Sequence, residues 1–265
     1  MNITFRLETP ADRYAVEAMT REAFWQFWED GRKICDEHLL VHKLRTAQGF
    51  VPELNYVAEV DGELVGHIIF TKSRIEGEDG KETETLTFGP LTVLPEMQSK
   101  GIGKALMRHT FAEAKRLGYR AVLIFGHPDY YPRAGFRRAA EFGVTTADGK
   151  TFDAFMAYPL YDGALDGIRG RYFIDPVYEQ LSQEEALAFD TKFPPKTPHS
   201  PVPLKTLLER LEPGAAKAIQ GLGIPNLDIL KSRSERDISS LEGMDEKAVE
   251  TVRAVMREHG YRWGG

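Results

Sequence analysis

The chain has 265 residues, of which 42% are hydrophobic and 28% charged, and its formal net charge is −6. This composition is typical of a globular protein, and the length is sufficient for two domains. The acidic balance disfavours nucleic-acid binding through a basic surface and mildly favours a cationic small molecule as ligand. The single cysteine, Cys35, excludes an internal disulfide, so we expect a reducing cytoplasmic compartment.

No stretch approaches the roughly 18 apolar residues of a membrane span, and Met1 to Pro10 lacks the pattern of an export signal. We therefore expect no membrane segment. Alternation predicts an edge strand over Ile3 to Leu7. Thr9-Pro10-Ala11-Asp12 carries the signals of a helix start, and we expect that helix to run to about Phe27.

Aromatic residues crowd the end of this first helix, and we expect them to form core and pocket wall. They are Phe24, Trp25, Phe27 and Trp28. A second helix is predicted over Ile34 to Leu44. Within it, His38 and His42 are four residues apart and could share a face as metal ligands. Because no third ligand stands at suitable spacing, we predict packing or solvated histidines and no metal.

Three antiparallel strands are predicted next. Asn55 to Val60 and Leu64 to Arg74 flank the strong hairpin turn signal Asp61-Gly62, and Lys81 to Val93 follows. Gly89-Pro90 falls inside the third strand, where proline cannot donate to the ladder and glycine often marks a bulge. Pairing should therefore break at this point and free backbone donors.

The stretch LTVLPEMQSKGIGKAL, Leu91 to Leu106, runs from a strand through a glycine-spaced turn into a helix. The first turn of a helix has unpaired N–H groups and its dipole favours an anion. Gly101 and Gly103 let the chain turn tightly and let a diphosphate approach the backbone. The spacing Gln-x-x-Gly-x-Gly lacks both the dinucleotide fingerprint and the Gly-Lys-Ser/Thr of a P-loop. An ordinary strand-to-helix turn is the alternative.

The helix is predicted from Lys104 to Leu117, with Gly118 as its stop. Its apolar side should carry Ile102, Ala105, Leu106 and Leu117, and its basic side Lys104, Arg108 and Lys115. The continuous apolar run Ala121 to Phe125 is typical of a strand buried on both faces. Together these elements form a βαβ unit.

From Ile3 to Tyr158 the sequence resembles the Gcn5-related N-acetyltransferase (GNAT) superfamily, and its small bacterial members in particular. VLPEMQSKGIGKALM fills every position of the acetyl-coenzyme A signature, and YYPRAGF is similar to a downstream segment of the family. The resemblance implies an α+β fold with a mixed, mostly antiparallel sheet flanked by helices. It also implies acetyl-CoA as co-substrate and an amine acceptor, either a small molecule or a peptide.

Further implications of the resemblance concern single residues. The pantetheine arm would bind the backbone near the bulge, the diphosphate the turn, and Tyr131 would lie near the coenzyme sulfur and protonate the departing thiolate. The implied cofactor-binding residues are Leu91, Thr92, Val93, Gln98, Ser99, Lys100, Gly101, Ile102, Gly103 and Lys104. An asparagine common in the family has no counterpart, because the segment is shortened and offers His127 instead.

In this interpretation the amine attacks the thioester directly, and amides near Val93 stabilise the oxyanion. Glu82, Glu84 and His127 are candidates for the base, and a water chain could serve instead. The alternative is an acyl-CoA-binding sensor or regulatory protein whose tail docks a protein or DNA partner.

Beyond this unit, alternation of Phe152, Ala154 and Met156 predicts another strand, and Tyr161 to Tyr178 an irregular extension. Ser182 begins a capping box that opens a short helix ending at Asp190. Five prolines between Phe193 and Pro203 favour an extended spacer. We therefore predict a catalytic domain over 1–180, a helix and linker over 181–203, and a helical domain over 204–265.

The tail carries repeated helix signals, with caps at Asn226, Ser234 and Asp245 and an end at Gly260. Its apolar frame resembles the carboxy-terminal helix-hairpin-helix domain of RNA polymerase α subunits. This frame comprises Leu211, Ala218, Gly223, Ile224, Leu227, Leu230, Ile238, Leu241, Val249 and Val252.

The positions that hold DNA in that family differ here, because Gly214, Lys217 and the acidic start Asp245-Glu246-Lys247-Ala248 take their place. From Leu204 to Gly265, ten Lys or Arg balance ten Asp or Glu. An acidic pair at a helix start repels phosphate. A protein-docking or packing role is therefore favoured over nucleic-acid binding.

Overall fold

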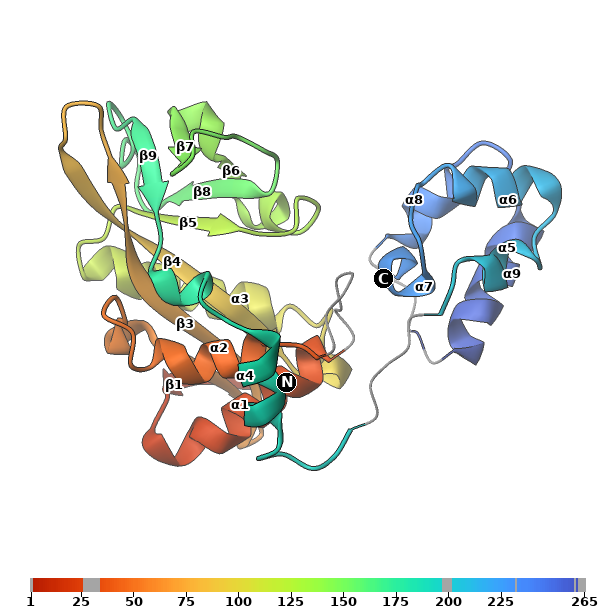
Figure 1. Cartoon of the computed structure of the whole chain (residues 1–265), viewed down its shortest axis with the longest axis horizontal. Coiled ribbons are helices and arrows are strands. Elements are labelled where there is room, and N and C mark those ends of the chain that lie inside the picture. The colour runs from red at the N-terminus through yellow and green to blue at the C-terminus, as the bar shows by residue number, and fades with distance from the viewer. Residues whose placement is uncertain (1, 26–33, 197–201, 232, 260, 262–265) are drawn as a thin grey trace. The chain divides into compact units, whose positions relative to one another are not determined.

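The computed structural model describes residues 2–25, 34–196, 202–231, 233–259 and 261. The chain divides into two compact units, Met1–Pro195 and Lys196–Gly265. Figure 1 shows the first unit as a twisted sheet with helices packed on it, and the second as a group of helices. No helix in the described part of the chain is long and apolar enough to span a membrane.

The first unit contains one nine-stranded sheet within the described residues, with the order β1-β2-β3-β4-β5-β8-β6. Strand β9 pairs with the far end of β3 and with β7. All pairs are antiparallel except β4 with β5 and β7 with β9. The strands are β1 (Ile3–Leu7), β2 (Tyr56–Val60), β3 (Glu63–Glu76), β4 (Glu82–Val93), β5 (Ala121–Phe125), β6 (Arg137–Arg138), β7 (Val144–Thr146), β8 (Phe155–Pro159) and β9 (Gly170–Phe173).

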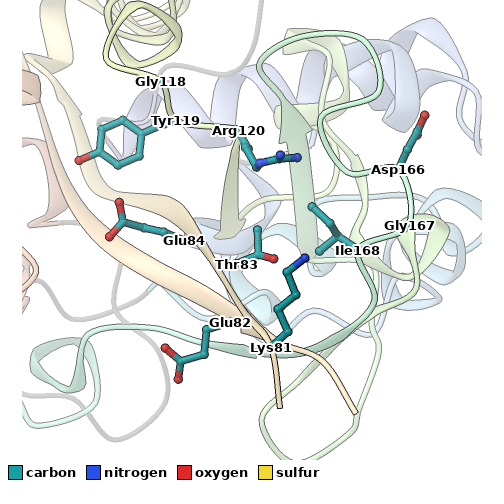
Figure 2. Close-up of a pocket in the computed structure, with 10 residues that line it drawn as sticks. All are labelled: Lys81, Glu82, Thr83, Glu84, Gly118, Tyr119, Arg120, Asp166, Gly167 and Ile168. Atoms are coloured by element: carbon teal, nitrogen blue, oxygen red, sulfur yellow. The ribbon is translucent and has the colours of Figure 1, made fainter. Parts of the chain in front are cut away.

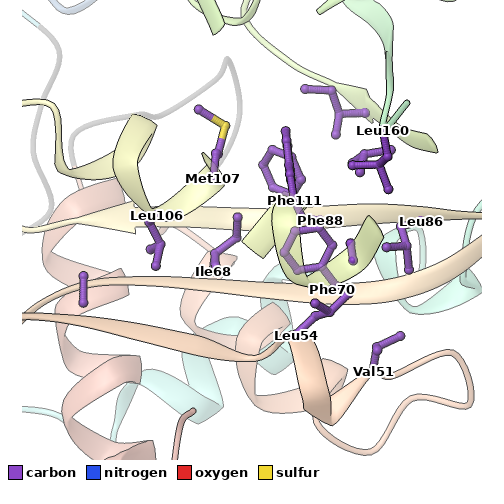
Figure 3. Close-up of a cluster of buried hydrophobic side chains, with 14 of the residues drawn as sticks. Val51, Leu54, Ile68, Phe70, Leu86, Phe88, Leu106, Met107, Phe111 and Leu160 are labelled. Atoms are coloured by element: carbon purple, nitrogen blue, oxygen red, sulfur yellow. The ribbon is translucent and has the colours of Figure 1, made fainter. Parts of the chain in front are cut away.

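Helices cover both faces of this sheet (Figure 1). The α3 face carries Phe70 of β3 and Phe88 of β4, which pack with Phe111 of α3 in the main core (Figure 3). Side chains on a strand alternate between faces. On β4 the extra residue at Gly89-Pro90 shifts this alternation, so Thr92 points away from the Phe88 face and toward α1, where its hydroxyl lies 3.1 Å from that of Thr20. The helices of this unit are α1 (Arg13–Phe24), α2 (Glu37–Leu44), α3 (Ile102–Arg116) and α4 (Gln183–Asp190).

The predicted hairpin at Asp61-Gly62 is confirmed. Both residues have positive φ, 53° and 88°, as a two-residue hairpin turn of type I′ requires. The edge strand β1 and the three antiparallel strands β2, β3 and β4 are confirmed as well, with the bounds given above. The mixed, mostly antiparallel sheet with flanking helices that the sequence predicts is therefore present.

The predicted interruption of β4 is also present. Phe88 pairs with Phe70 and Leu91 with Ile68, so Gly89 and Pro90 together oppose one residue of β3. The parallel ladder between β4 and β5 consists of the single pair Leu86–Val122. Beyond that pair the two strands separate, and the end of β4 has no strand partner on its β5 side in the described residues.

The two helical bounds near the N-terminus differ from the prediction. A 3-10 turn, Pro10–Asp12, precedes α1, because the Asp12 carboxylate accepts from the backbone N–H of Thr9 and holds the first turn tightly. Residues 26–33 lie outside the described residues, and with them the predicted end at Phe27 and the aromatic Trp28. Helix α2 begins at Glu37, since Ile34 and Cys35 leave the helical path to pack against Trp25.

The strand predicted from Phe152 begins instead at Phe155. Phe152 precedes the strand and is 47% exposed, and three consecutive residues of β8 are buried. Alternation fails because β8 is an interior strand between β5 and β6 and is covered on both faces. The irregular extension contains β9, which the sequence did not predict. Leu117, placed on the apolar side of α3, is 39% exposed because it caps the helix end.

Helix α4 is capped as predicted, with the Ser182 hydroxyl accepting from the Glu185 N–H. It packs within the first unit. The Asp190 carboxylate accepts two hydrogen bonds from the Arg21 guanidinium, at 2.5 and 2.8 Å, and lies 3.2 Å from the buried His38 ring. This short helix is therefore fixed to α1 and α2.

The second unit has its own apolar core, which includes Leu207, Ile219, Leu230 and Val252. The predicted caps are present: the side chains of Asn226, Ser234 and Asp245 each accept a backbone N–H three residues on. Pro198, Pro201 and Gly260, which marked the linker and the last helix end, lie outside the described residues. The helices are α5 (Lys205–Leu208), α6 (Pro213–Gln220), α7 (Leu227–Leu230), α8 (Glu235–Ser239) and α9 (Glu246–Glu258).

Candidate functional site

The turn between β4 and α3 presents a row of unpaired backbone donors. Ser99 and Gly101 have positive φ, 60° and 81°, and α3 begins at Ile102. Within the described part of the chain, no backbone N–H from Ser99 to Lys104 donates to a protein acceptor. Successive amides in such a conformation form an anion-binding hollow, which the helix dipole reinforces. We call Ser99 to Lys104 the amide nest.

Gln98 ties the nest to the end of β4. Its side-chain amide donates to the Val93 carbonyl at 3.1 Å, so this residue is occupied in shaping the turn. The Leu94 N–H donates to Val65 of β3. Because amides on a strand alternate sides, those of Val93 and Leu91 point away from β3, toward the gap beside β5, and that of Thr92 points toward β3. The two outward amides can bind an extended ligand.

Gly103 lies where α3, β4 and the following loop meet. A β-carbon there would be 3.2 Å from the Tyr130 hydroxyl oxygen, 3.5 Å from Cγ2 of Val93 and 3.6 Å from Cδ2 of Leu91. Lys104 reaches from the same helical turn to the loop and donates to the Arg133 carbonyl at 3.3 Å. Glycine at 103 therefore permits the close packing of three elements at the nest.

Tyr131 begins a 3-10 turn, Tyr131–Ala134, that follows β5. Its ring packs against Phe88 and Phe136, with centroids 6.0 and 5.3 Å away, on the α3 face beside the gap. Burial, with a smaller effect of the neighbouring Tyr130, raises the pKa of its phenol well above the usual range. The hydroxyl therefore stays protonated at neutral pH and can act as an acid.

The three candidate bases lie in different places. His127 is the second residue after β5, and its side chain is half exposed. Its Nδ1 accepts from the Asp129 N–H at 3.2 Å. Glu82 and Glu84 occupy the opposite end of β4 from the nest, where they form exposed ion pairs with Arg74 and Lys72 at 2.9 and 3.0 Å. Neither glutamate is placed to serve chemistry at Tyr131.

These glutamates line a separate cavity of about 460 Å³ (Figure 2). It includes Gly118 at the C-terminal end of α3, whereas the nest lies at the N-terminal end. A helix of 15 residues is about 22 Å long, so the cavity and the nest are distinct places. The cavity is lined by Lys81, Glu82, Thr83, Glu84, Gly118, Tyr119, Arg120, Asp166, Gly167 and Ile168.

The two histidines considered as metal ligands face different partners. His38 is buried beside Asp190, and Nδ1 of His42 lies 3.0 Å from the Glu17 carboxylate. Among the residues that the structure describes, no three His, Cys, Asp or Glu side chains are grouped to hold a metal ion.

A family model described as acetyltransferase (GNAT) family matches residues 18–136, which include β4, the nest and Tyr131. This part of the chain is similar to the GNAT acetyltransferases. The chain is 28% identical over 165 residues to YhbS of Escherichia coli K12, an uncharacterized N-acetyltransferase, and the match covers 62% of this chain and 92% of YhbS. It is 36% identical over 101 residues to YjhQ, another uncharacterized N-acetyltransferase of that strain, covering 38% of this chain and 55% of YjhQ.

Two solved structures show the same GNAT fold. The crystal structure of E. coli YhbS in complex with CoA has a TM-score of 0.59 at 25% identity and covers 69% of this chain and 94% of that chain. A GNAT acetyltransferase from Brucella melitensis in complex with acetyl-CoA has a TM-score of 0.51 at 27% identity and covers 67% and 98%. The family resemblance predicted from the sequence is thus confirmed, and the chain is an acyltransferase of the N-acetyltransferase type.

Some residues near the nest were not predicted from the sequence. The sequence assigns a role to Tyr131 and none to Tyr130, because no local pattern places the Tyr130 hydroxyl over Gly103. The Lys104–Arg133 contact joins residues 29 apart and depends on the fold. The close contact of Gly126 with the Tyr131 ring could have been predicted from the sequence, because a glycine directly after a buried strand often marks a place where another group approaches the backbone.

Proposed function

We propose that the chain transfers the acetyl group of acetyl-CoA to a primary amine, with the diphosphate bound at the amide nest. The single observation that carries this proposal is the run of unpaired amides from Ser99 to Lys104 at the start of α3. The relatives crystallised with CoA and acetyl-CoA support the same co-substrate. The family match favours catalysis over the sensor alternative.

The pantetheine arm would extend along the end of β4 after the bulge. There the amides of Leu91 and Val93 face the gap that opens beyond the Leu86–Val122 pair. An arm held in this gap would carry the thioester toward the bulge. Amides that point into the gap would also stabilise the negative charge that develops on the thioester oxygen.

Direct attack by the amine needs little covalent chemistry from the protein, so positioning supplies most of the rate. Tyr131 would donate its proton to the departing thiolate, and its raised pKa keeps that proton on the phenol at neutral pH until the thiolate forms. A protonated amine must also lose a proton before attack. His127 or a chain of waters would serve, because Glu82 and Glu84 lie at the far end of β4.

For the second unit we propose a protein partner. Its likeness to the RNA polymerase α domain stays a prediction, as do its role as a separate domain and the cytoplasmic location of the chain. At the start of α9, Asp245 accepts from the Ala248 N–H at 2.7 Å, so a carboxylate already occupies one of the donors that a phosphate would need. A titration of duplex DNA with the full chain at low salt should show no salt-dependent binding.

The catalytic proposal is tested by thiol release from acetyl-CoA over amino acids, polyamines, aminoglycosides and peptide amino termini. We expect release with at least one class, and a loss of about 10²-fold or more in kcat for Tyr131→Phe with CoA affinity retained. If the protein binds CoA but releases no thiol with any class of amine, the sensor alternative would be supported.

A further inference from the structure

Tyr130 directs its hydroxyl at the first turn of α3. The oxygen lies 3.2 Å from the place of a β-carbon on Gly103, a point that Val93 and Leu91 of β4 also approach. The hydroxyl is therefore placed at the corner where the nest meets the outward-facing amides of β4. A coenzyme that bound both would pass this corner.

The Tyr130 hydroxyl has no protein hydrogen-bond partner among the residues that the structure describes. Burial raises the pKa of this phenol above its ordinary value, so the group is a hydrogen-bond donor at neutral pH. The residue as a whole is 43% exposed, so a ligand can reach it. The phenol donor and the unpaired amides are therefore placed to bind the same anion.

We propose that Tyr130 is a further cofactor-binding residue, whose hydroxyl donates to a diphosphate oxygen of the coenzyme above Gly103. This inference rests on the proposed function, since it adds a side-chain donor to the nest. The Tyr130 hydroxyl would donate to the diphosphate from the side of the loop, whereas the amides of the nest would donate from the start of α3.

The loop around Tyr130 is held to α3. The Tyr130 carbonyl accepts from the Arg133 N–H at 3.2 Å, and the Arg133 carbonyl accepts from Lys104 at 3.3 Å. The Tyr130 and Tyr131 rings meet edge to face, with centroids 5.0 Å apart. One short loop would thus contact the diphosphate through Tyr130 and the sulfur through Tyr131, at the two ends of the pantetheine arm.

Tyr130→Phe tests this inference, because the ring and its packing stay and only the hydroxyl is removed. We expect CoA, titrated by calorimetry, to bind Tyr130→Phe about 5- to 20-fold more weakly than the wild type. The control Tyr161→Phe removes an exposed hydroxyl beyond β8 and should bind CoA within twofold of the wild type. The thermal midpoints of the free proteins should agree.

Gly103→Ala, made in the wild type and in Tyr130→Phe, tests whether the Tyr130 hydroxyl lies over Gly103. The added methyl would meet the Tyr130 oxygen, so it should weaken CoA binding more in the wild type than in Tyr130→Phe. Equal losses in the two backgrounds, or CoA affinity of Tyr130→Phe within twofold of the wild type, would overturn the inference and leave the proposed function standing. Absence of CoA binding by the wild type would overturn both.

Discussion

The ring of Tyr131 lies directly against the backbone of Gly126. A β-carbon at position 126 would overlap Cδ2 and Cε2 of that ring, atoms that cannot shift without moving the whole side chain. Glycine at the end of β5 is therefore what lets the phenol occupy its place on the α3 face beside the gap. The absence of a side chain at Gly126 therefore determines where Tyr131, the proposed acid, can lie.

The first prediction follows from this contact. Gly126→Ala should push the Tyr131 ring off its position and lower kcat by about 10-fold or more, while CoA affinity changes by no more than a few-fold. The control Gly214→Ala adds a methyl in open space on α6 and should leave kcat unchanged. Steady-state thiol release and calorimetry measure the two quantities. An unaltered kcat in Gly126→Ala would show that the ring position is irrelevant to turnover.

The second prediction concerns the cavity lined by Glu84. Because Glu84 lies four residues before Phe88, the β4 residue that packs against Tyr131, it is about 13 Å along the strand from that residue, and Glu84→Gln should leave kcat and its pH profile within twofold of the wild type. The ion pair with Lys72 is solvent-exposed, so stability should change by less than about 1 kcal/mol. A tenfold fall in kcat, or the loss of one of the two pH-dependent slopes of kcat, would contradict this and indicate that Glu84 is the general base.

The third prediction addresses how α4 is held. Asp190→Asn leaves the buried Arg21 guanidinium without its charged partner, at a cost of about 3 kcal/mol in the free energy of unfolding of the first unit. The matched control is Glu185→Gln, which breaks the exposed pair with Lys43 and should cost less than about 1 kcal/mol. Urea denaturation measures both. Similar losses in the two variants would mean that the buried pair contributes no more than a surface one.

The fourth prediction is a pH dependence of stability. His67 is fully buried and donates from Nε2 to Oδ1 of Asn55 at 2.8 Å. Burial lowers its pKa to about 4, against the smaller opposing effect of the Glu8 carboxylate. In the unfolded chain the ring titrates near 6.5, so between these values the unfolded state binds a proton that the folded state does not. Stability should therefore fall as the pH falls, by about 3 kcal/mol from this group.

Urea denaturation at pH 7 and pH 4.5 compares the wild type with His67→Gln, which keeps a donor for Asn55. The pKa of the buried His38 is also lowered to about 4, chiefly by burial, so the variant should retain roughly half of the histidine contribution in this window. The same loss of stability on acidification in both proteins would contradict a neutral buried His67.

Local signals in the sequence determined much of the fold. Asp61-Gly62 has the positive φ angles that a type I′ turn requires. The side chains of Ser182, Asn226 and Asp245 each cap a helix by accepting the backbone N–H three residues on. Strand β9 has no such signal, because its pairing with β3 joins Arg74 and Phe173, nearly 100 residues apart. Elements whose partners are distant in sequence cannot be identified from a local pattern.

The candidate site divides in the same way. The amide nest could be predicted, because glycine spacing and a helix start are both local features of Gln98 to Lys104. Where Tyr130 places its hydroxyl, and why Glu84 is remote from Tyr131, depend on the path of the loop after β5 and on the direction of β4. Such distances follow from packing and not from sequence spacing.

The central claim is that the coenzyme diphosphate binds the unpaired amides of Ser99 to Lys104. A titration of ¹⁵N-labelled protein with CoA, followed by NMR, tests it most directly. We expect saturable shifts concentrated on these amides and on those of Leu91 and Val93. Saturation without shifts at the nest, or shifts centred on the cavity by Tyr119 and Glu84, would contradict the claim.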